Sequence, residues 1–236
     1  MFELKGARVL CVGGTSGIGL GTAQMAAALG AQVTVASRSE GKVRGAKEMI
    51  GHGTAGMALD TADENAIEAV FKREAPFDHI VVSASQTQSL LVKELPLATA
   101  YANMNSKFWG AYRIARAARI NDKGSLTLVS GYLSIRPRKG SAIQGAINAA
   151  VEGLSRGLAI EFAPVRVNCV SPGLVNTPLL DRFGDRKEAM LAEARKTIPA
   201  GIVGESEHIA RQIIACMTNP FMTGSTIYLD GGGSIA

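Results

Sequence analysis

Short apolar runs alternate with longer stretches of helix-forming residues along the chain. The runs are rich in Val, Ile and Leu, which is typical of strands buried in a parallel sheet. We expect strands at residues 7–12, 32–37, 56–60, 78–85, 124–130, 165–170 and 225–229. Between them lie predicted helices at 20–29, 63–74, 97–119, 142–161, 179–199 and 205–217. This alternation predicts an α/β fold, a doubly wound parallel sheet of about seven strands flanked by helices.

The length and composition fit a single globular domain spanning residues 1–236, without linker or repeat. Apolar residues make up 47% of the chain and charged residues 19%, as in ordinary globular proteins. The formal net charge is +5, but the basic residues are scattered and aromatic side chains are few. We therefore expect a mildly basic surface that suits an anionic cofactor, and no nucleic-acid partner.

The cysteines and histidines favour neither disulfides nor a metal site. Cys11 and Cys169 lie in predicted strands, so they are interpreted as buried thiols in a reducing compartment. The histidines are isolated from one another and from the cysteines, so these residues do not have the spacing of metal ligands. Residues 1–6 lack the basic start and long apolar middle of a secretion signal, and charged residues interrupt the most apolar helix. We expect a cytoplasmic protein without a membrane segment.

A glycine-rich turn follows the first predicted strand and opens the first helix. Gly13 allows a tight turn, Gly17 lets backbone approach a diphosphate, and Gly19 lets the helix pack on the strand. Free N–H groups at the positive end of a helix bind phosphate, so the turn predicts nucleotide binding. The alternative is a structural turn of some other α/β protein. The remaining candidate contacts in the turn are Thr15, Ser16 and Ile18.

The end of the second strand predicts which dinucleotide is bound. Folds that prefer NAD place an acid there, which accepts hydrogen bonds from the ribose 2′-OH and repels a 2′-phosphate. This chain has Ser37, Arg38 and Ser39 instead, so a guanidinium and two hydroxyls face that position. We expect NADP (NADPH), the alternative being that Arg38 is a solvated loop cation.

The turn has the spacing G-x-x-x-G-x-G, which resembles the T-G-x-x-x-G-x-G motif of the short-chain dehydrogenase/reductase family, with Val12 in place of the threonine. Three further segments are similar to family motifs: residues 105–110, residues 172–177 (P-G-x-x-x-T) and residues 230–233. The resemblance covers the whole chain in one register. It implies a Rossmann-like fold and a homodimer or homotetramer packed through the helices that begin near residues 97 and 142.

The resemblance also implies further cofactor contacts. Asp60 would accept from the adenine amino group with Thr61 beside it, although Asp60 could instead only turn the chain. Ala84 is the one residue kept from the family tetrad N-N-A-G, here residues 82–85. In the segment that starts at Pro172 and Gly173, the Val175 backbone and the Thr177 hydroxyl would hold the nicotinamide carboxamide. A plain turn would explain Pro172-Gly173 but not its place after a strand.

The family's catalytic pair Tyr-x-x-x-Lys falls on Gln144 and Asn148, so both usual side chains are missing. The usual serine falls on Gly131, with Ser130 as the closest stand-in. A glutamine amide donates a hydrogen bond but gives no proton at neutral pH, and loss of a positioned acid costs about 10²- to 10⁴-fold in rate. Asn105 would hold a helix carbonyl or a water of the proton relay, or is simply a polar helix residue.

Of the chain's four tyrosines, the one in the loop after the fifth strand is the candidate for a displaced acid. Tyr132 is the tyrosine beside the expected substrate crevice, and Pro137 argues against a helix that would align it with Arg136. Tyr132 is thus a substitute acid or an aromatic that covers the crevice, and Lys139 is a weaker candidate for the missing cation. The loop's cations either attract an acidic substrate arm or are solvated. Residues 179–199 are expected to form a mobile lid.

Two functions remain open on the sequence. The first is an NADP(H)-dependent oxidoreductase that acts on a small-molecule carbonyl or alcohol with an altered proton-transfer site. The second is a catalytically silent nucleotide-binding protein, a sensor or the partner of an active sibling in a hetero-oligomer. The missing pair at Gln144 and Asn148 favours the second function, and the intact nicotinamide segment favours the first.

Overall fold

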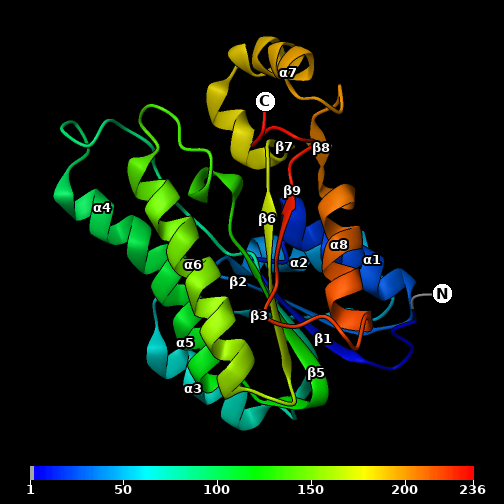
Figure 1. The fold of residues 1–236 in the computed structure, drawn as a ribbon. Helices are drawn as coiled ribbons and strands as arrows, with labels where there is room; N and C mark the ends of the chain where they lie inside the picture. Colours follow the sequence, from blue (N-terminus) through cyan, green and yellow to red (C-terminus); the bar gives the residue numbers. More distant parts are fainter. Residues whose placement is uncertain (1–2) are drawn as a thin grey trace.

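The structure is a computed structural model that describes residues 3–236, so Met1 and Phe2 of the segment assessed for a secretion signal lie outside it. A parallel sheet with the strand order β3-β2-β1-β4-β5-β6-β9 forms the centre (Figure 1). Its strands are β1 (Arg8–Val12), β2 (Gln32–Ser37), β3 (Ala55–Ala58), β4 (Phe77–Val82), β5 (Ile120–Val129), β6 (Arg166–Pro172) and β9 (Thr226–Leu229). The predicted doubly wound fold is confirmed.

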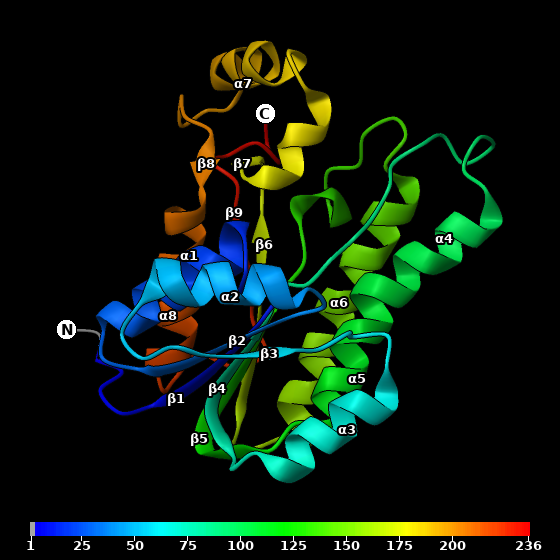
Figure 2. The same cartoon turned by 180° about the vertical axis from the view of Figure 1, so that it is seen from behind.

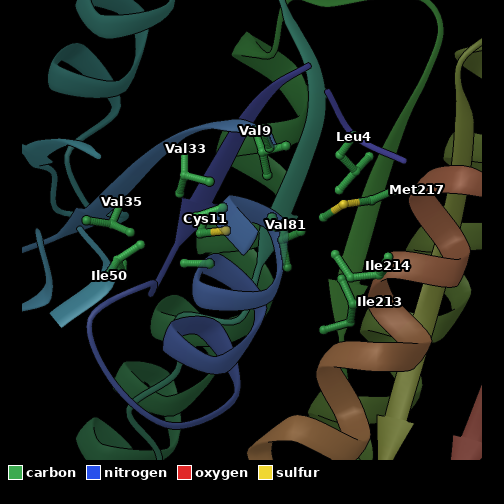
Figure 3. Close-up of a cluster of buried hydrophobic side chains, with 14 of the residues drawn as sticks. Leu4, Val9, Cys11, Val33, Val35, Ile50, Val81, Ile213, Ile214 and Met217 are labelled. Atoms are coloured by element: carbon green, nitrogen blue, oxygen red, sulfur yellow. The ribbon is translucent and has the colours of Figure 1, made fainter. Parts of the chain in front are cut away.

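Helices cover both faces of the sheet (Figure 2). The α-helices are α1 (Gly17–Ala28), α2 (Glu40–Ile50), α3 (Glu64–Arg73), α4 (Leu97–Met104), α5 (Gly110–Ala117), α6 (Ala142–Glu161), α7 (Arg186–Thr197) and α8 (Ser206–Thr218). Side chains of α1, α2 and α8 pack on one face in the core cluster of Figure 3, where Val9, Cys11 and Val81 are completely or almost completely buried. Side chains of α3, α5 and α6 pack on the other face around Phe71, Phe77 and Leu128.

The strand order reverses between β1 and β4. The chain runs outward from β1 to β3, crosses back to β4 and then continues outward in the other direction through β5 and β6. In such sheets ligands bind in the crevice beyond the carboxyl ends of the strands at the reversal. The loops that follow β1 and β4 therefore border the expected binding crevice.

The predicted helix at 97–119 is one helical rod with an irregular middle. A π-helical turn, η1 (Asn105–Trp109), joins α4 to α5 without leaving the helical region of backbone conformation. Single π-turns inside helices are often found at functional sites because they change which side chains face a neighbour. The turn contains Lys107, whose side chain reaches the carboxyl end of β5.

The segment predicted as a lid forms a small unit of its own. It consists of the 3₁₀ turn η3 (Pro178–Phe183) and α7, which lies beyond the carboxyl end of β6 (Figure 1). Leu180, Leu191 and Val203 form its separate apolar cluster. A two-stranded sheet of β7 (Val175–Asn176) and β8 (Gly204–Glu205) ties the start and end of this unit together. Its mobility stays a prediction.

No helix in residues 3–236 combines the length and apolar character needed to span a membrane. In the same residues, no three His, Cys, Asp or Glu side chains gather in a way that could hold a metal ion.

Candidate functional site

The glycine turn leaves no room for side chains where it meets β4. Gly13 has a φ of +87°, and a Cβ built on it would lie 2.6 Å from the Ala84 backbone nitrogen. A Cβ on Gly19 would overlap the Gly13 carbonyl oxygen and lie 2.5 Å from Ser83 Oγ. Because of these contacts, glycine is required at both positions.

The amino end of α1 is free of competing side chains. Its N-cap residue Ser16 is extended and makes no side-chain capping bond, and the first turn holds no acidic residue. The first amides of a helix have no intrahelical acceptor, and the helix dipole adds positive potential there. This end of the helix therefore suits an anion such as a diphosphate.

The segment after β6 lies directly across from the turn. A Cβ on Gly17, whose φ is +51°, would lie 3.3 Å from Cβ and Cγ2 of Thr177. Gly173 donates its amide to the Leu229 carbonyl at 3.1 Å, and Val175 is buried in β7. Strand ends far apart in the sequence therefore bring Thr177 beside the glycine turn, and Pro172 ends β6 just before it.

The side chains after β2 have different partners. Arg38 is exposed and donates from Nη2 to Gln86 Oε1 at 2.5 Å, across the mouth of the crevice. Ser39 Oγ accepts the Lys42 amide at 3.3 Å as the N-cap of α2, so that hydroxyl is already used. Ser37 ends β2 and is half-buried. The guanidinium of Arg38 and the hydroxyl of Ser37 are the groups that remain for a phosphate.

Asp60 turns the chain and keeps an oxygen for a ligand. Its Oδ1 accepts the Ala62 amide at 2.9 Å. The next residue, Thr61, is buried, and its carbonyl accepts from Arg113 Nη1 at 3.2 Å. Since the bond to Ala62 uses Oδ1, the adenine contact and the turn function are compatible for Asp60.

The Asn105 side chain forms a hydrogen bond within its own helical rod. Its Oδ1 accepts from Arg113 Nη2 at 2.7 Å. That bond joins the π-turn to α5 and gives the asparagine a structural partner. Its expected role in a proton relay stays a prediction.

The two residues at the positions of the family's catalytic pair are both held by hydrogen bonds. Gln144 Nε2 donates to Thr87 Oγ1 at 3.0 Å, and Gln144 Oε1 accepts from Ser89 Oγ at 2.6 Å. This amide therefore fastens α6 to the loop after β4. Asn148 is buried, and a Cβ on Gly131 would lie 2.9 Å from Asn148 Nδ2. Asn148 thus fills the space next to the position of the missing serine.

Lys107 is the residue that the sequence analysis missed. Its Nζ donates to the Ser130 carbonyl and to Asn148 Oδ1, both at 2.7 Å. An amine from η1 therefore reaches the position on α6 at which the resemblance placed a lysine. Lys107 lies next to Ser106 within a segment that matched a family motif, but no spacing in the sequence links it to Asn148.

Glu152 is a second buried group that the sequence analysis did not use. Its carboxyl group accepts hydrogen bonds from four hydroxyls at 2.7 to 3.0 Å, those of Ser130, Ser134, Ser171 and Tyr228. Burial, followed by the bond to Glu152, raises the pKa of Tyr228. Because the Ser130 hydroxyl donates to Glu152, it is not directed freely at a substrate.

Burial lowers the pKa of Lys107 to about 8, while Cys169 and Glu152 act in the opposite direction. Burial also raises the pKa of Cys169 to about 11, so this thiol carries no charge where Lys107 titrates. The charge of nearby Glu152 thus offsets part of the effect of burial on the Lys107 pKa.

Tyr132 lies in the 3₁₀ turn η2 (Tyr132–Ser134), which ends before Pro137 as expected. It is buried, and the Arg138 guanidinium lies 5.4 Å from its ring centre. The Arg136 guanidinium contacts the Ala236 carbonyl. Residues 135–138 line a cavity of about 560 Å³ together with Thr197 and Ile198 at the end of α7. The cationic loop, including exposed Lys139, thus borders the lid unit.

Comparison with known proteins identifies the family. A family model described as enoyl-(acyl carrier protein) reductase matches residues 12–234. The short-chain dehydrogenase/reductase ucsE of Acremonium sp is 32% identical over an alignment of 259 residues, covering 99% of this chain and 97% of that protein. This chain belongs to the short-chain dehydrogenase/reductase family.

Solved structures agree with this assignment to the short-chain dehydrogenases/reductases. The MalC reductase/Diels-Alderase of Malbranchea aurantiaca superposes with a TM-score of 0.92 at 28% identity, covering 99% of this chain and 98% of that one. A small-chain dehydrogenase in complex with NADPH superposes with a TM-score of 0.86 at 33% identity, covering 98% and 100%. The match to this oxidoreductase family thus extends over nearly all of the residues compared. The roles of its individual site residues remain predictions.

Proposed function

We propose that this protein is an NADP(H)-dependent oxidoreductase that interconverts a carbonyl and an alcohol. The observation that carries the proposal is the glycine turn, which leads into the amino end of α1, free of a side-chain cap, with Thr177 beside Gly17. The structural neighbour that was solved with NADPH and the relatives named as reductases support the same function.

The residues around the crevice would hold a dinucleotide in one orientation, with its adenine and nicotinamide ends at different strand ends. Backbone amides of the turn, including those of Thr15, Ser16 and Ile18, would hold the diphosphate. Asp60 would hold the adenine, and Val175 and Thr177 the nicotinamide carboxamide. A bound dihydronicotinamide would supply hydride to a carbonyl carbon, and the protein would have to orient that carbonyl and provide positive charge and a proton at its oxygen.

Arg38 would distinguish NADPH from NADH. A guanidinium has five N–H donors, so Arg38 can keep its bond to Gln86 while it binds a 2′-phosphate. No acidic side chain ends β2, because Ser37 stands there. The charge and donor geometry at this point favour the phosphorylated dinucleotide.

A second function is a nucleotide-binding protein without turnover. It is favoured by Gln144, whose amide oxygen and nitrogen both bind the loop after β4 and cannot protonate a substrate. Such a protein would bind NADPH and signal its presence or support an active partner.

A cytoplasmic location fits the cysteines. Cys11, Cys169 and Cys216 are buried and unpaired in the described residues. Free thiols of this kind suit a reducing compartment.

The test is a fluorescence titration with NADPH and NADH, followed by oxidation assays with a panel of carbonyl compounds. The proposal predicts tighter binding of NADPH and oxidation of NADPH by at least one carbonyl class. Binding of NADPH without turnover on any compound would favour the silent protein. Failure to bind either dinucleotide would contradict both functions.

A further inference from the structure

The ammonium group of Lys107 is held between the carboxyl end of β5 and the middle of α6. It comes from η1, which belongs to neither element, and its two acceptors are the Ser130 carbonyl and Asn148 Oδ1 at 2.7 Å each. Both acceptors lie where the crevice of the doubly wound sheet is expected. Three separate elements thus converge to position one amine.

The surroundings of Lys107 are not those of a structural ion pair. In residues 3–236 its amine makes no salt bridge, and both of its hydrogen-bond acceptors are uncharged. The nearby carboxyl group of Glu152 is occupied by four hydroxyl donors. Holding an ammonium among neutral acceptors costs free energy of desolvation, so stability alone does not explain this residue.

We propose that Lys107 supplies the cation of this site and binds a ligand oxygen in the crevice, with Asn148 as the residue that positions it. An ammonium group has three N–H donors, and two are used on Asn148 and Ser130. The third is left for a hydroxyl of the dinucleotide or the carbonyl oxygen of the substrate. This assignment rests on the proposed function, because that function supplies the ligand.

The titration of the amine gives the proposal a measurable consequence. Near pH 7 Lys107 is protonated, and it loses its charge as the pH rises through its pKa of about 8. The groups that face it are Glu152 on α6 and Cys169 on β6, and the thiol stays neutral in this range because its pKa is about 11. Ligand binding that needs the cation therefore weakens above pH 8.

The experiment compares Lys107→Met with the double variant Lys107→Asn/Asn148→Lys, which moves the ammonium onto α6. Lys72→Met removes an exposed lysine from α3 and serves as the control. NADPH affinity is measured by fluorescence between about pH 6.5 and 9.5. Values of kcat and KM are measured with an active carbonyl compound, and circular dichroism checks the fold.

We expect Lys107→Met to lose about 10²-fold in NADPH affinity or in kcat/KM, the effect of removing one charged donor. A loss of NADPH affinity assigns the Lys107 contact to the dinucleotide. A loss of kcat/KM with unchanged NADPH affinity assigns it to the substrate. The NADPH affinity and kcat/KM of the double variant should lie within about tenfold of the wild-type values, because the ammonium returns to the same space. The control should match wild type.

Two results would overturn the assignment while leaving the proposed function intact. One is wild-type NADPH affinity and turnover that are both constant across pH 8. The other is a folded Lys107→Met variant with wild-type affinity and turnover. If Lys107→Met does not fold, the wild-type pH profile and the double variant decide whether Lys107 supplies the cation. Wild-type protein that binds no dinucleotide would instead refute the proposed function itself.

Discussion

Single side chains in the crevice differ in how far the sequence could predict them. Gly13, Gly17 and Gly19 were predictable, because only glycine tolerates the backbone conformation and close contacts of such a turn. Lys107 was not predictable, because its contact with Asn148 spans 41 residues and depends on how two helices pack. A local motif reports local geometry, whereas a convergent contact exists only in the folded chain.

Alanine at Gly17 tests the turn without disturbing the core. With a φ of +51° and Thr177 at 3.3 Å, a methyl group would strain the backbone by about 1–2 kcal/mol and shield the amides. We expect NADPH affinity to fall by about tenfold or more, a free energy of about 1.4 kcal/mol. Fluorescence titration measures this effect.

The control for that variant is Gly45→Ala, in α2, where a Cβ meets nothing within 4 Å. It should leave NADPH affinity unchanged and stabilise the helix slightly. Equal affinities of both alanine variants for NADPH would show that the turn does not contact the dinucleotide.

Arg38→Gln tests the choice of dinucleotide. Removal of a charge-assisted bond to a 2′-phosphate costs about 1.5–3 kcal/mol, so NADPH should bind about 10- to 100-fold more weakly. NADH affinity should stay as in wild type. Arg44→Gln removes another exposed arginine, from α2, as the control. A parallel loss for NADH and NADPH in Arg38→Gln would argue for a structural role through Gln86.

At the scale of elements, the strand and helix order was predictable and several boundaries were not. The predicted fourth strand extended to Ser85, but β4 ends at Val82 because the chain there bends into the crevice loop. Helix α2 was missed because Gly41 and Gly45 interrupt its helical pattern. The π-turn η1 could not be foreseen either, since tertiary packing decides whether a helix takes an extra residue.

The pairing of β4 with β5 contains a pH-sensitive contact. His79 Nδ1 lies 2.9 Å from Ser125 Oγ, and burial lowers the pKa of His79 to about 4, with Asp78 opposing and Arg166 adding to the shift. Since the unfolded chain binds the proton at a higher pH than the folded chain, stability is lost as the pH falls from about 6.5 toward 4.

We expect this histidine to contribute about 2 kcal/mol to the loss of stability between pH 7 and 5, out of about 3 kcal/mol over its whole titration. His79→Asn keeps a polar partner for Ser125 but cannot be protonated, so its unfolding free energy should fall less between pH 7 and 5. Urea denaturation at both pH values measures the difference. Identical losses in wild type and variant would contradict the assignment.

At the scale of the whole molecule, one helical rod carries an exposed apolar face. Leu97, Tyr101, Trp109 and Tyr112 on α4, η1 and α5 are each 41–67% exposed. An apolar stripe of this kind is typical of a subunit contact. The homo-oligomer stays a prediction, as does the single domain.

We expect a dimer or tetramer by light scattering, and a shift to smaller species in the variant Tyr101→Lys. Met49→Lys places the same charge on exposed α2 as a control and should leave the mass unchanged. Wild-type protein that is monomeric at micromolar concentration would refute this use of the stripe.

The central claim is that the first strand-to-helix turn grips the diphosphate of a dinucleotide. A crystal structure of the protein at saturating NADPH tests it most directly. The account predicts diphosphate oxygens within hydrogen-bond distance of amides between Gly13 and Gly19, with the nicotinamide next to Thr177. An empty turn, or NADPH bound elsewhere on the molecule, would contradict it.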